Sequence, residues 1–154
     1  LRTALIAMST SIERISRLLP ITLRNVYRLI AVEMDKGGTE LRLPQYGMLD
    51  FLLTHSEAVQ TDLANHFAKD KSVMLRQLDE MERAGWIERQ MDPSDRRRKN
   101  LVVTKAGLEV HRKVSRMSAK VFAKVLEGMN EKEVDTCLKV LGHMNGIANN
   151  TDPE

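Results

Sequence analysis

The chain carries the sequence DPSDRRRK at residues 92–99, in which a turn signal runs directly into four cationic side chains. Residues 86–90 combine apolar with polar side chains, and residues 101–104 are rich in β-branched ones. Both patterns are typical of β-strands. Asp-Pro favours the start of a turn, and Pro93 has no amide to give to a sheet ladder. We therefore predict a β-hairpin with a positively charged tip, although the charge run taken alone is equally consistent with a solvated loop.

The composition is that of one globular domain that is mostly helical. The 154 residues are 42% hydrophobic and 29% charged, as is usual for such a domain. Aromatic residues make up only 4%, and there are nine methionines, which we interpret as core residues that pack between helices. The formal net charge is only +3, so binding to nucleic acid has to be argued from where the charges lie.

The number of cysteines and the hydropathy of the chain indicate where in the cell the protein is located. Cys137 is the single cysteine, which excludes an internal disulfide; we interpret it as a small buried residue, with a reactive thiol as the alternative. The longest apolar run is far shorter than the roughly 18 residues that a membrane span needs, and the N-terminus lacks the pattern of a signal peptide. We expect a cytoplasmic protein that does not bind membranes.

Two short helices with a brief break between them precede the hairpin, at about residues 60–68 and 71–84. Asp70 stands directly before the second helix and Gly85 directly after it, as expected at helix ends. Two such helices joined by a tight turn resemble a helix-turn-helix. Their apolar spacing predicts six inward-facing residues, which are Leu63, Ala64, Phe67, Met74, Leu78 and Met81.

Apolar periodicity predicts further helices on both sides of this region. Pro20 interrupts the first pattern and either kinks one long helix or opens a second one. Thr104 is placed to cap the helix after the hairpin, and Asn130 with Glu133 forms a capping-box pattern before the last one. The predicted helices cover residues 1–19, 21 to the break at 37–38, 44 to about 55–56, 104 to the break at 128, and 130–148.

The order of helix, turn, helix and charged hairpin predicts a winged helix-turn-helix. In that arrangement the second helix fits the major groove of DNA, and the hairpin tip reaches the adjacent minor groove. The N-terminal half of the second helix carries the cations and would approach DNA, since its acids lie toward the other end. Arg76 has an alternative, because it could pair along the helix with Asp79 or Glu80.

Five motifs in this region follow one another as they do in the multiple-antibiotic-resistance regulator (MarR) family, and the chain resembles that family. The match is dense from about residue 45 to residue 110, while the flanking helices agree in pattern and length. The motifs are LA at 63–64, KS and R at 71–72 and 76, ExxGWI at 82–87, DPxDRR at 92–97 and TKxG at 104–107.

The resemblance implies a single domain in which residues 1–38 and 105–149 form dimerisation helices and residues 44–104 form the DNA-binding lobe. It implies a sequence-specific transcriptional regulator, most often a repressor, that binds a pseudo-palindromic double-stranded operator as a homodimer. Members of the family bind a small, often aromatic and anionic ligand between the lobe and the dimer helices. We therefore expect such an effector, of unknown identity, and no other cofactor.

The resemblance also assigns residues to DNA. Arg97 falls on the wing-tip arginine that enters the minor groove, and Asp95 on the acid that orients the wing through ion pairing. Two departures from the family concern Lys69, in a turn position that is commonly apolar, and Leu75, which could touch a thymine methyl group or simply pack. The remaining expected DNA contacts are Thr61, Lys71, Ser72, Arg76, Arg96, Arg98 and Lys99.

The sequence offers little support for other classes of function. It contains no phosphate-binding glycine loop, nucleophile elbow or zinc-protease motif, so we expect no catalytic residues. The four histidines and Cys137 form no tight ligand pattern, so we expect no metal. The alternative to a DNA-binding regulator is a winged-helix module that docks a protein partner, which would not need four adjacent cations.

Overall fold

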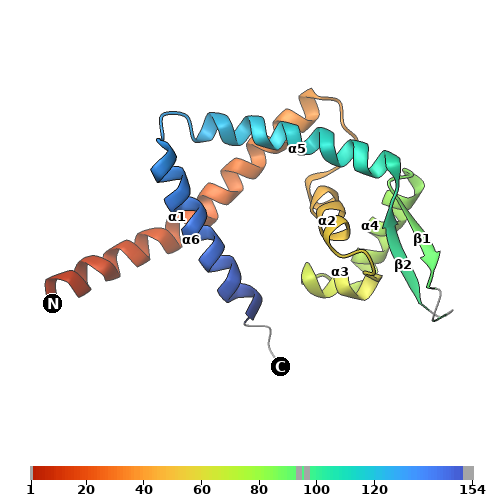
Figure 1. Ribbon diagram of the computed structural model, residues 1–154, viewed down its shortest axis with the longest axis horizontal. Coiled ribbons are helices and arrows are strands. Elements are labelled where there is room, and N and C mark those ends of the chain that lie inside the picture. The colour runs from red at the N-terminus through yellow and green to blue at the C-terminus, as the bar shows by residue number, and fades with distance from the viewer. Residues whose placement is uncertain (1, 93–94, 96–97, 151–154) are drawn as a thin grey trace.

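The computed structural model describes residues 2–92, 95 and 98–150 (Figure 1). It confirms a mostly helical chain with one small antiparallel hairpin. In order, the elements are α1 (Arg2–Lys36), α2 (Leu43–Thr54), α3 (Gln60–His66), α4 (Lys71–Arg83), β1 (Ile87–Met91), β2 (Lys99–Val103), α5 (Lys105–Val125) and α6 (Glu131–Asn150).

The hairpin lies where the sequence predicts it, with one difference at its tip. Ile87 is opposite Val103 and Met91 is opposite Lys99. Lys99 therefore belongs to strand β2, whereas the sequence groups it with the arginines of the turn. Pro93, Ser94 and residues 96–97 lie outside the described residues.

The core lies where α2, α3, α4 and the hairpin meet α5 and the second half of α1. The inward positions predicted for the helix pair are confirmed for five buried residues, while Phe67 packs against them partly buried. Leu53 is 40% exposed, although the buried Leu52 directly precedes it, because consecutive side chains point about 100° apart around a helix. The fully buried side chains are Met48, Leu49, Leu63, Met74, Leu78, Met81, Ile87, Leu101 and Val114.

Local capping residues set the helix ends as predicted. Thr104 Oγ1 accepts a hydrogen bond from the Gly107 amide at 3.0 Å and caps α5. At the start of α6, Asn130 and Glu133 bond each other's backbone amides, at 2.9 and 3.1 Å, in a reciprocal capping box. These bonds satisfy amides that a helix start leaves without partners.

The first half of α1 and α6 form a stem that stands apart from the lobe, while the second half of α1 packs beside α5 (Figure 1). The helix α1 continues through Pro20, so a separate helix does not begin there. None of the helices in the described part of the chain combines the length and apolar content that a bilayer-spanning helix needs.

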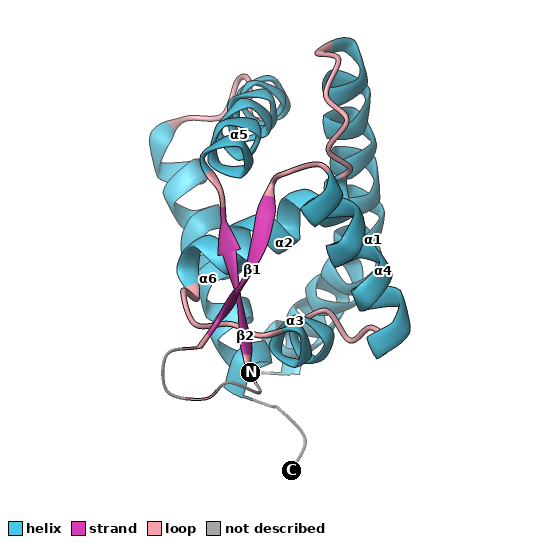
Figure 2. Cartoon of the chain, turned by 90° about the vertical axis from the view of Figure 1, so that its right-hand side faces the viewer, coloured by secondary structure: helices cyan, strands magenta, loops and turns pink. Residues whose placement is uncertain are grey.

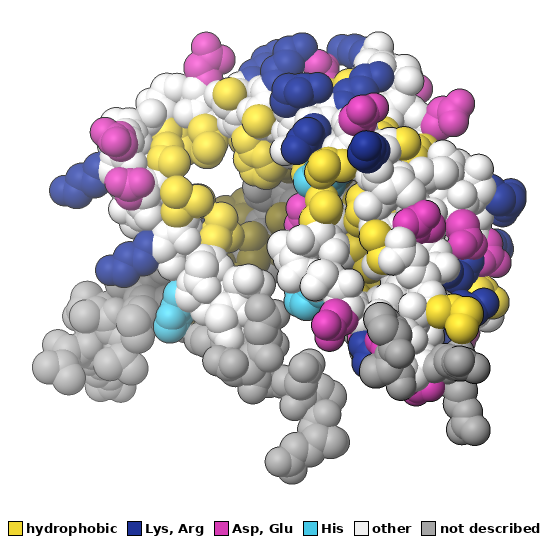
Figure 3. All heavy atoms as spheres, turned by 45° about the vertical axis from the view of Figure 1, so that its right-hand side comes forward, with side chains coloured by type: hydrophobic (Ala, Val, Ile, Leu, Met, Phe, Trp, Pro, Cys, Tyr) yellow, Lys and Arg dark blue, Asp and Glu magenta, His cyan; other side chains and the backbone are white. Residues whose placement is uncertain are grey.

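The stem exposes apolar side chains that its helices do not bury. On one face of the molecule, hydrophobic side chains gather around a hollow (Figure 3). Cys137 is exposed in this single chain, so its interpretation as a buried residue requires a partner that covers α6 and stays a prediction. The exposed apolar residues of the stem include Ile12, Ile15, Leu18, Leu138, Val140 and Leu141.

Candidate nucleic-acid interface

The N-terminal half of α4 presents a polar and cationic face. Lys71, Ser72, Leu75 and Arg76 are all exposed on it, and Leu75 is 43% exposed, so it does not simply pack in the core. The positions i, i+1, i+4 and i+5 lie on one side of a helix. The structure therefore brings together the three residues predicted for the recognition helix, with Leu75 among them.

Asp70 fixes the start of α4. Its Oδ1 accepts hydrogen bonds from the Ser72 amide at 2.9 Å and from the Ser72 hydroxyl at 2.8 Å. Both bonds favour the charged carboxylate, and they lower the pKa of Asp70 below its ordinary 3.8. The Ser72 hydroxyl hydrogen is engaged by this cap, so toward a ligand the Ser72 oxygen is available as an acceptor.

The acids that could have paired with Arg76 are held by other arginines. Arg89 of β1 lies 2.6 Å from Asp79, and Arg42 pairs with Glu80. Within the described part of the chain, the Arg76 guanidinium forms no hydrogen bond or ion pair of its own. The alternative in which Arg76 pairs along its own helix is therefore not what the structure adopts.

The two remaining DNA contacts predicted for the helix pair lie in the first turn of α3 and in the turn between α3 and α4. Thr61 is exposed in the first turn of α3, and Lys69 is partly buried just before α4. Ala68 has a φ of +46°, which lets the Lys69 amide bond the Ala64 carbonyl at 2.9 Å. This left-handed residue makes the tight turn that the helix-turn-helix pattern requires.

The structure describes only part of the wing tip. Arg96 and Arg97 lie outside the described residues. The Asp95 amide donates to Asp92 Oδ1 at 3.2 Å, and the Asp95 carbonyl accepts from the Arg98 amide at 2.9 Å, so Asp95 helps to close the turn. Its predicted ion pairing with the wing tip stays a prediction.

Arg98 makes contacts that sequence reasoning missed. Its Nη2 donates to the Glu57 carbonyl at 2.7 Å and its Nε to Asn100 Oδ1 at 3.2 Å, while Asp92 Oδ2 lies 3.8 Å from the Nε. Arg98 therefore ties the wing to the loop between α2 and α3. Its side chain is still 43% exposed, so a phosphate contact stays a prediction beside this bracing role.

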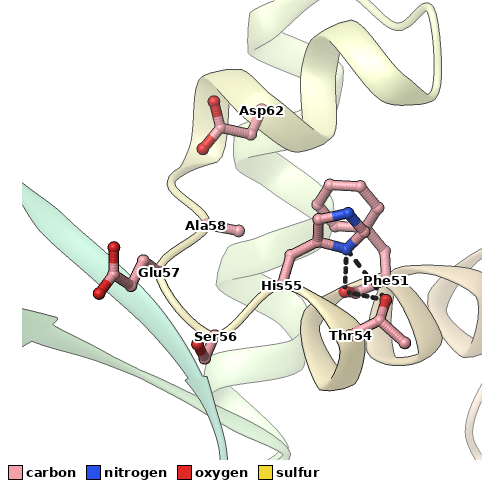
Figure 4. Close-up of a pocket in the computed structure, with 7 residues that line it drawn as sticks. All are labelled: Phe51, Thr54, His55, Ser56, Glu57, Ala58 and Asp62. Atoms are coloured by element: carbon pink, nitrogen blue, oxygen red, sulfur yellow. Dashed lines mark hydrogen bonds between the residues drawn. The ribbon is translucent and has the colours of Figure 1, made fainter.

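The same loop holds strand β2. The Leu101 amide donates to the Ala58 carbonyl at 3.0 Å. Figure 4 shows the loop beside the strands, at a pocket of about 380 Å³ in which the His55 ring stacks on Phe51 with ring centroids 4.0 Å apart. His55 Nδ1 also lies 2.9 Å from Thr54 Oγ1 and from the Phe51 carbonyl. These contacts fix the loop that positions the wing.

A pocket of about 370 Å³ lies between the start of α3 and the wing, and its lining includes three predicted phosphate contacts: Thr61, Arg98 and Lys99. The ends of β1 and β2 away from α5 lie on the same side of the lobe as α3 (Figures 1 and 2). The structure thus gathers these residues on one side of the lobe. Across the described residues, it forms no group of three or more histidine, cysteine or acidic side chains able to hold a metal.

Arg89 is the residue that sequence reasoning overlooked entirely. It lies on β1 and bonds both Asp79 and Glu82 of α4. A signal was present, since Arg89 has the same strand parity as the buried Ile87, and the two acids stand three residues apart on one helix face. The partners could not be assigned before the packing of β1 on α4 was known.

Comparison with known proteins agrees with this geometry. Residues 41–99 match the model of the MarR family. The solved structure of MarR is 28% identical and has a TM-score of 0.77, over 88% of this chain and 90% of that one. CouR from Rhodococcus jostii RHA1, bound to p-coumaroyl-CoA, is 25% identical with a TM-score of 0.68, over 84% and 90%. FabT from Streptococcus pneumoniae, in complex with DNA, is 23% identical with a TM-score of 0.71, over 91% and 99%.

Proposed function

Since this chain belongs to the MarR family of transcriptional regulators, we propose that it binds a pseudo-palindromic operator as a homodimer and represses transcription until a small ligand releases it. Helix α4 enters the major groove of each half-site and the wing reaches the adjacent minor groove. The two half-sites lie about one helical turn apart. FabT, which shares the fold and was solved with DNA, supports this arrangement.

The observation that carries the proposal is the separation of charge along α4. Lys71 and Arg76 are exposed in its N-terminal half, whereas Asp79 and Glu80 farther along are bound by arginines of the same chain. The first half of α4 attracts phosphate groups, and the acids of the second half repel them less because arginines already pair with these acids. A surface selected only to dock a neutral protein partner would not need this separation.

The roles of the contact residues follow from their chemistry. Lys71 and Arg76 face the bases and phosphates of the major groove, where an arginine can bond a guanine through two donors. Ser72, whose oxygen is available as an acceptor, faces the amino groups of the bases. Arg97 enters the minor groove, oriented by Asp95. The phosphate contacts, which set register and salt dependence, come from Thr61, Lys69, Arg96, Arg98 and Lys99.

The stem supplies the dimer interface. An apolar hollow of about 530 Å³ lies between α1 and α6, and its lining includes Ile15, Leu19, Cys137 and Leu141. Exposed apolar area of this kind is usually covered by a partner. In a homodimer the same helices of a second copy cover it, which sets the spacing of the two recognition helices.

The effector is a small aromatic or anionic molecule that binds between the lobe and the stem. CouR, bound to p-coumaroyl-CoA, supports this class of ligand. Such a ligand acts only through a difference in affinity between the DNA-competent and DNA-incompetent spacings of the dimer. A thermal-shift screen of small acids and phenols identifies it by a rise in the unfolding temperature.

Fluorescence anisotropy with the DNA that flanks the protein's own coding region tests operator binding. We expect saturable binding at moderate salt, with an affinity that falls steeply as salt rises. Scrambled DNA of equal length and composition is the control. If the specific and scrambled duplexes bind equally weakly, the winged-helix fold serves a protein partner instead, and the proposal is wrong.

A further inference from the structure

Arg89 joins the wing to the recognition helix. Its Nη2 lies 2.6 Å from Asp79 Oδ1, and its Nη1 pairs with Glu82. One guanidinium thus binds two carboxylates, one turn apart on α4, through separate nitrogens. The Arg89 side chain is only 18% exposed, so it lies at the junction of strand and helix and not on the open surface.

The position of Arg89 along β1 explains this geometry. Ile87, on the same face of the strand, is 1% exposed, and Met91 is 62% exposed. Arg89 lies between them, at the rim where the core ends and the wing begins to project. A cationic side chain at this position points toward the acids of α4 and not into solvent.

A second contact holds the hairpin at the same level. Arg89 is paired across the hairpin with Leu101, whose amide bonds the Ala58 carbonyl in the loop between α2 and α3. The hairpin is therefore attached at one register position both to the recognition helix and to the segment before α3. Beyond this level lie Met91 and Lys99, the last cross-strand pair.

We propose that Arg89 is a positioning residue for operator binding, which sets the wing relative to α4 so that the wing tip and the recognition helix engage adjacent grooves together. The inference rests on the proposed function. It assigns Arg89 no contact with DNA, because both ends of its guanidinium are already used by Asp79 and Glu82. A lysine could not replace it, since one ammonium group does not present the planar fork that reaches both acids.

A double-mutant cycle with the wing tests the inference. Operator affinity is measured by anisotropy for the wild type, Arg89→Gln, Arg97→Ala and the double variant. If Arg89 acts through the wing, Arg89→Gln weakens binding in the wild type but changes affinity by less than about twofold once Arg97 is absent. Additive losses would show that Arg89 acts independently of the wing and would overturn the proposal.

Arg42→Gln is the matched control. Arg42 also pairs with a carboxylate of α4, Glu80, but it lies before α2 and touches no described wing residue. Its loss is expected to be additive with Arg97→Ala. Coupling of equal size in both cycles would mean that any ion pair on α4 has this effect, and the specific role of Arg89 would be refuted.

Removal of the two acids that bind Arg89 is a further test, because electrostatic and positioning effects predict opposite changes in operator affinity. The double variant Asp79→Asn, Glu82→Gln keeps Arg89 and removes two negative charges near DNA. Electrostatics alone predicts tighter operator binding, whereas loss of the attachment predicts weaker binding. Tighter or unchanged binding would contradict the proposal, and this variant remains informative if Arg89→Gln does not fold.

Two further measurements separate the possible failures. Arg89→Lys should bind more weakly than the wild type, and full recovery of affinity would show that charge alone matters. Hydrogen exchange in the free protein should quicken over the hairpin amides in Arg89→Gln but not in Arg42→Gln. If the wild type binds no operator, the proposed function fails; if it binds and the cycle is additive, only the role of Arg89 fails.

Discussion

Gly107 marks the place where α5 approaches the hairpin most closely. A Cβ atom at this position would clash with the Trp86 carbonyl oxygen and would lie 2.9 Å from Val103 Cγ1. The same approach is held by Thr104, whose amide bonds the Trp86 carbonyl and whose hydroxyl donates to the Gly85 carbonyl at 2.6 Å. The glycine of the TKxG motif is thus required by packing.

Gly107→Ala should therefore lower the free energy of unfolding by about 2 kcal/mol or more, since the helix must move away from the backbone it contacts. Chemical denaturation measures the change. Gly47→Ala in α2 is the control: a Cβ there meets only side-chain carbons of Phe67, at the ordinary contact distances of 3.5 and 3.8 Å, so this helical substitution should be neutral or slightly stabilising. Equal effects of the two substitutions would contradict the packing argument.

Asp70 gives a prediction about pH. Because its pKa is lowered in the folded chain by the two bonds from Ser72, its stabilising effect is present above the ordinary pKa of 3.8 and is lost as pH falls through the lowered value. The stability difference between the wild type and Asp70→Ala should be largest near neutral pH and shrink below about pH 4.

Denaturation of both proteins at several pH values measures that difference. Asp70→Asn is the matched control, since asparagine is also a good helix cap but does not titrate. Its stability relative to Asp70→Ala should stay nearly constant over the same range. A wild-type advantage that persists unchanged well below pH 4 would show that the charged cap is not its source.

Residues whose partners are close in sequence were predictable, and those with distant partners were not. Asp70, Thr104 and the Asn130–Glu133 box act on amides two or three positions away, so a local pattern identifies them. Arg98 bonds a carbonyl 41 positions away, and Arg89 pairs with acids seven and ten positions away on another element. Such pairs depend on tertiary packing.

At the scale of elements, the wing is an attached unit and not a free arm. Arg98 bonds the Glu57 carbonyl through its guanidinium, in addition to any charge it offers to phosphate. Arg98→Lys keeps the charge but loses the fork that reaches both Glu57 and Asn100. We expect operator affinity to fall although net charge is unchanged, as measured by anisotropy at fixed salt.

Lys99→Arg is the companion variant for this test. Lys99 is exposed on β2, and its side chain bonds no other described residue, so exchanging one cation for another should leave affinity nearly unchanged. Identical affinities for Arg98→Lys and the wild type would mean that Arg98 acts only as a charge and that its bond to Glu57 does not position the wing.

The ends of the helices were predictable from local residues such as glycines. Whether a helix continues through a proline, and which of its side chains are buried, depended on tertiary packing. Gly85, with φ of +73°, and Gly128, with φ of +87°, lie two and three residues after the last residues of α4 and α5, where the sequence predicts the breaks. The sequence left open how Pro20 is accommodated, and α1 runs through it. Leu53 is exposed beside the buried Leu52, because the facing of a side chain depends on its angle around the helix and on what packs there.

At the scale of the whole molecule, the stem is the part that leaves large apolar side chains exposed in a single chain. Leu138 is 63% exposed on α6 and Ile12 is 59% exposed on α1. We expect Leu138→Asp to dissociate the proposed homodimer, because it would place a charge in the proposed interface, where that charge would have to be desolvated. Sedimentation velocity measures the change in mass.

Lys139→Asp provides the control on the neighbouring position of the same helix, and it should leave the dimer intact. Operator binding should fall with dimerisation in Leu138→Asp, since one half-site alone retains only part of the contacts. A monomeric wild type, or a Leu138→Asp variant that sediments as a dimer, would show that these helices serve another purpose.

Hydroxyl-radical footprinting on the operator tests the central claim most directly, because it reports the accessibility of each deoxyribose along the DNA backbone. We predict two protected segments about one helical turn apart, each flanked by minor-groove protection that is lost in Arg97→Ala while the central protection remains. Uniform cleavage of the DNA, or a footprint that Arg97→Ala leaves unchanged, would contradict recognition by α4 and the wing together.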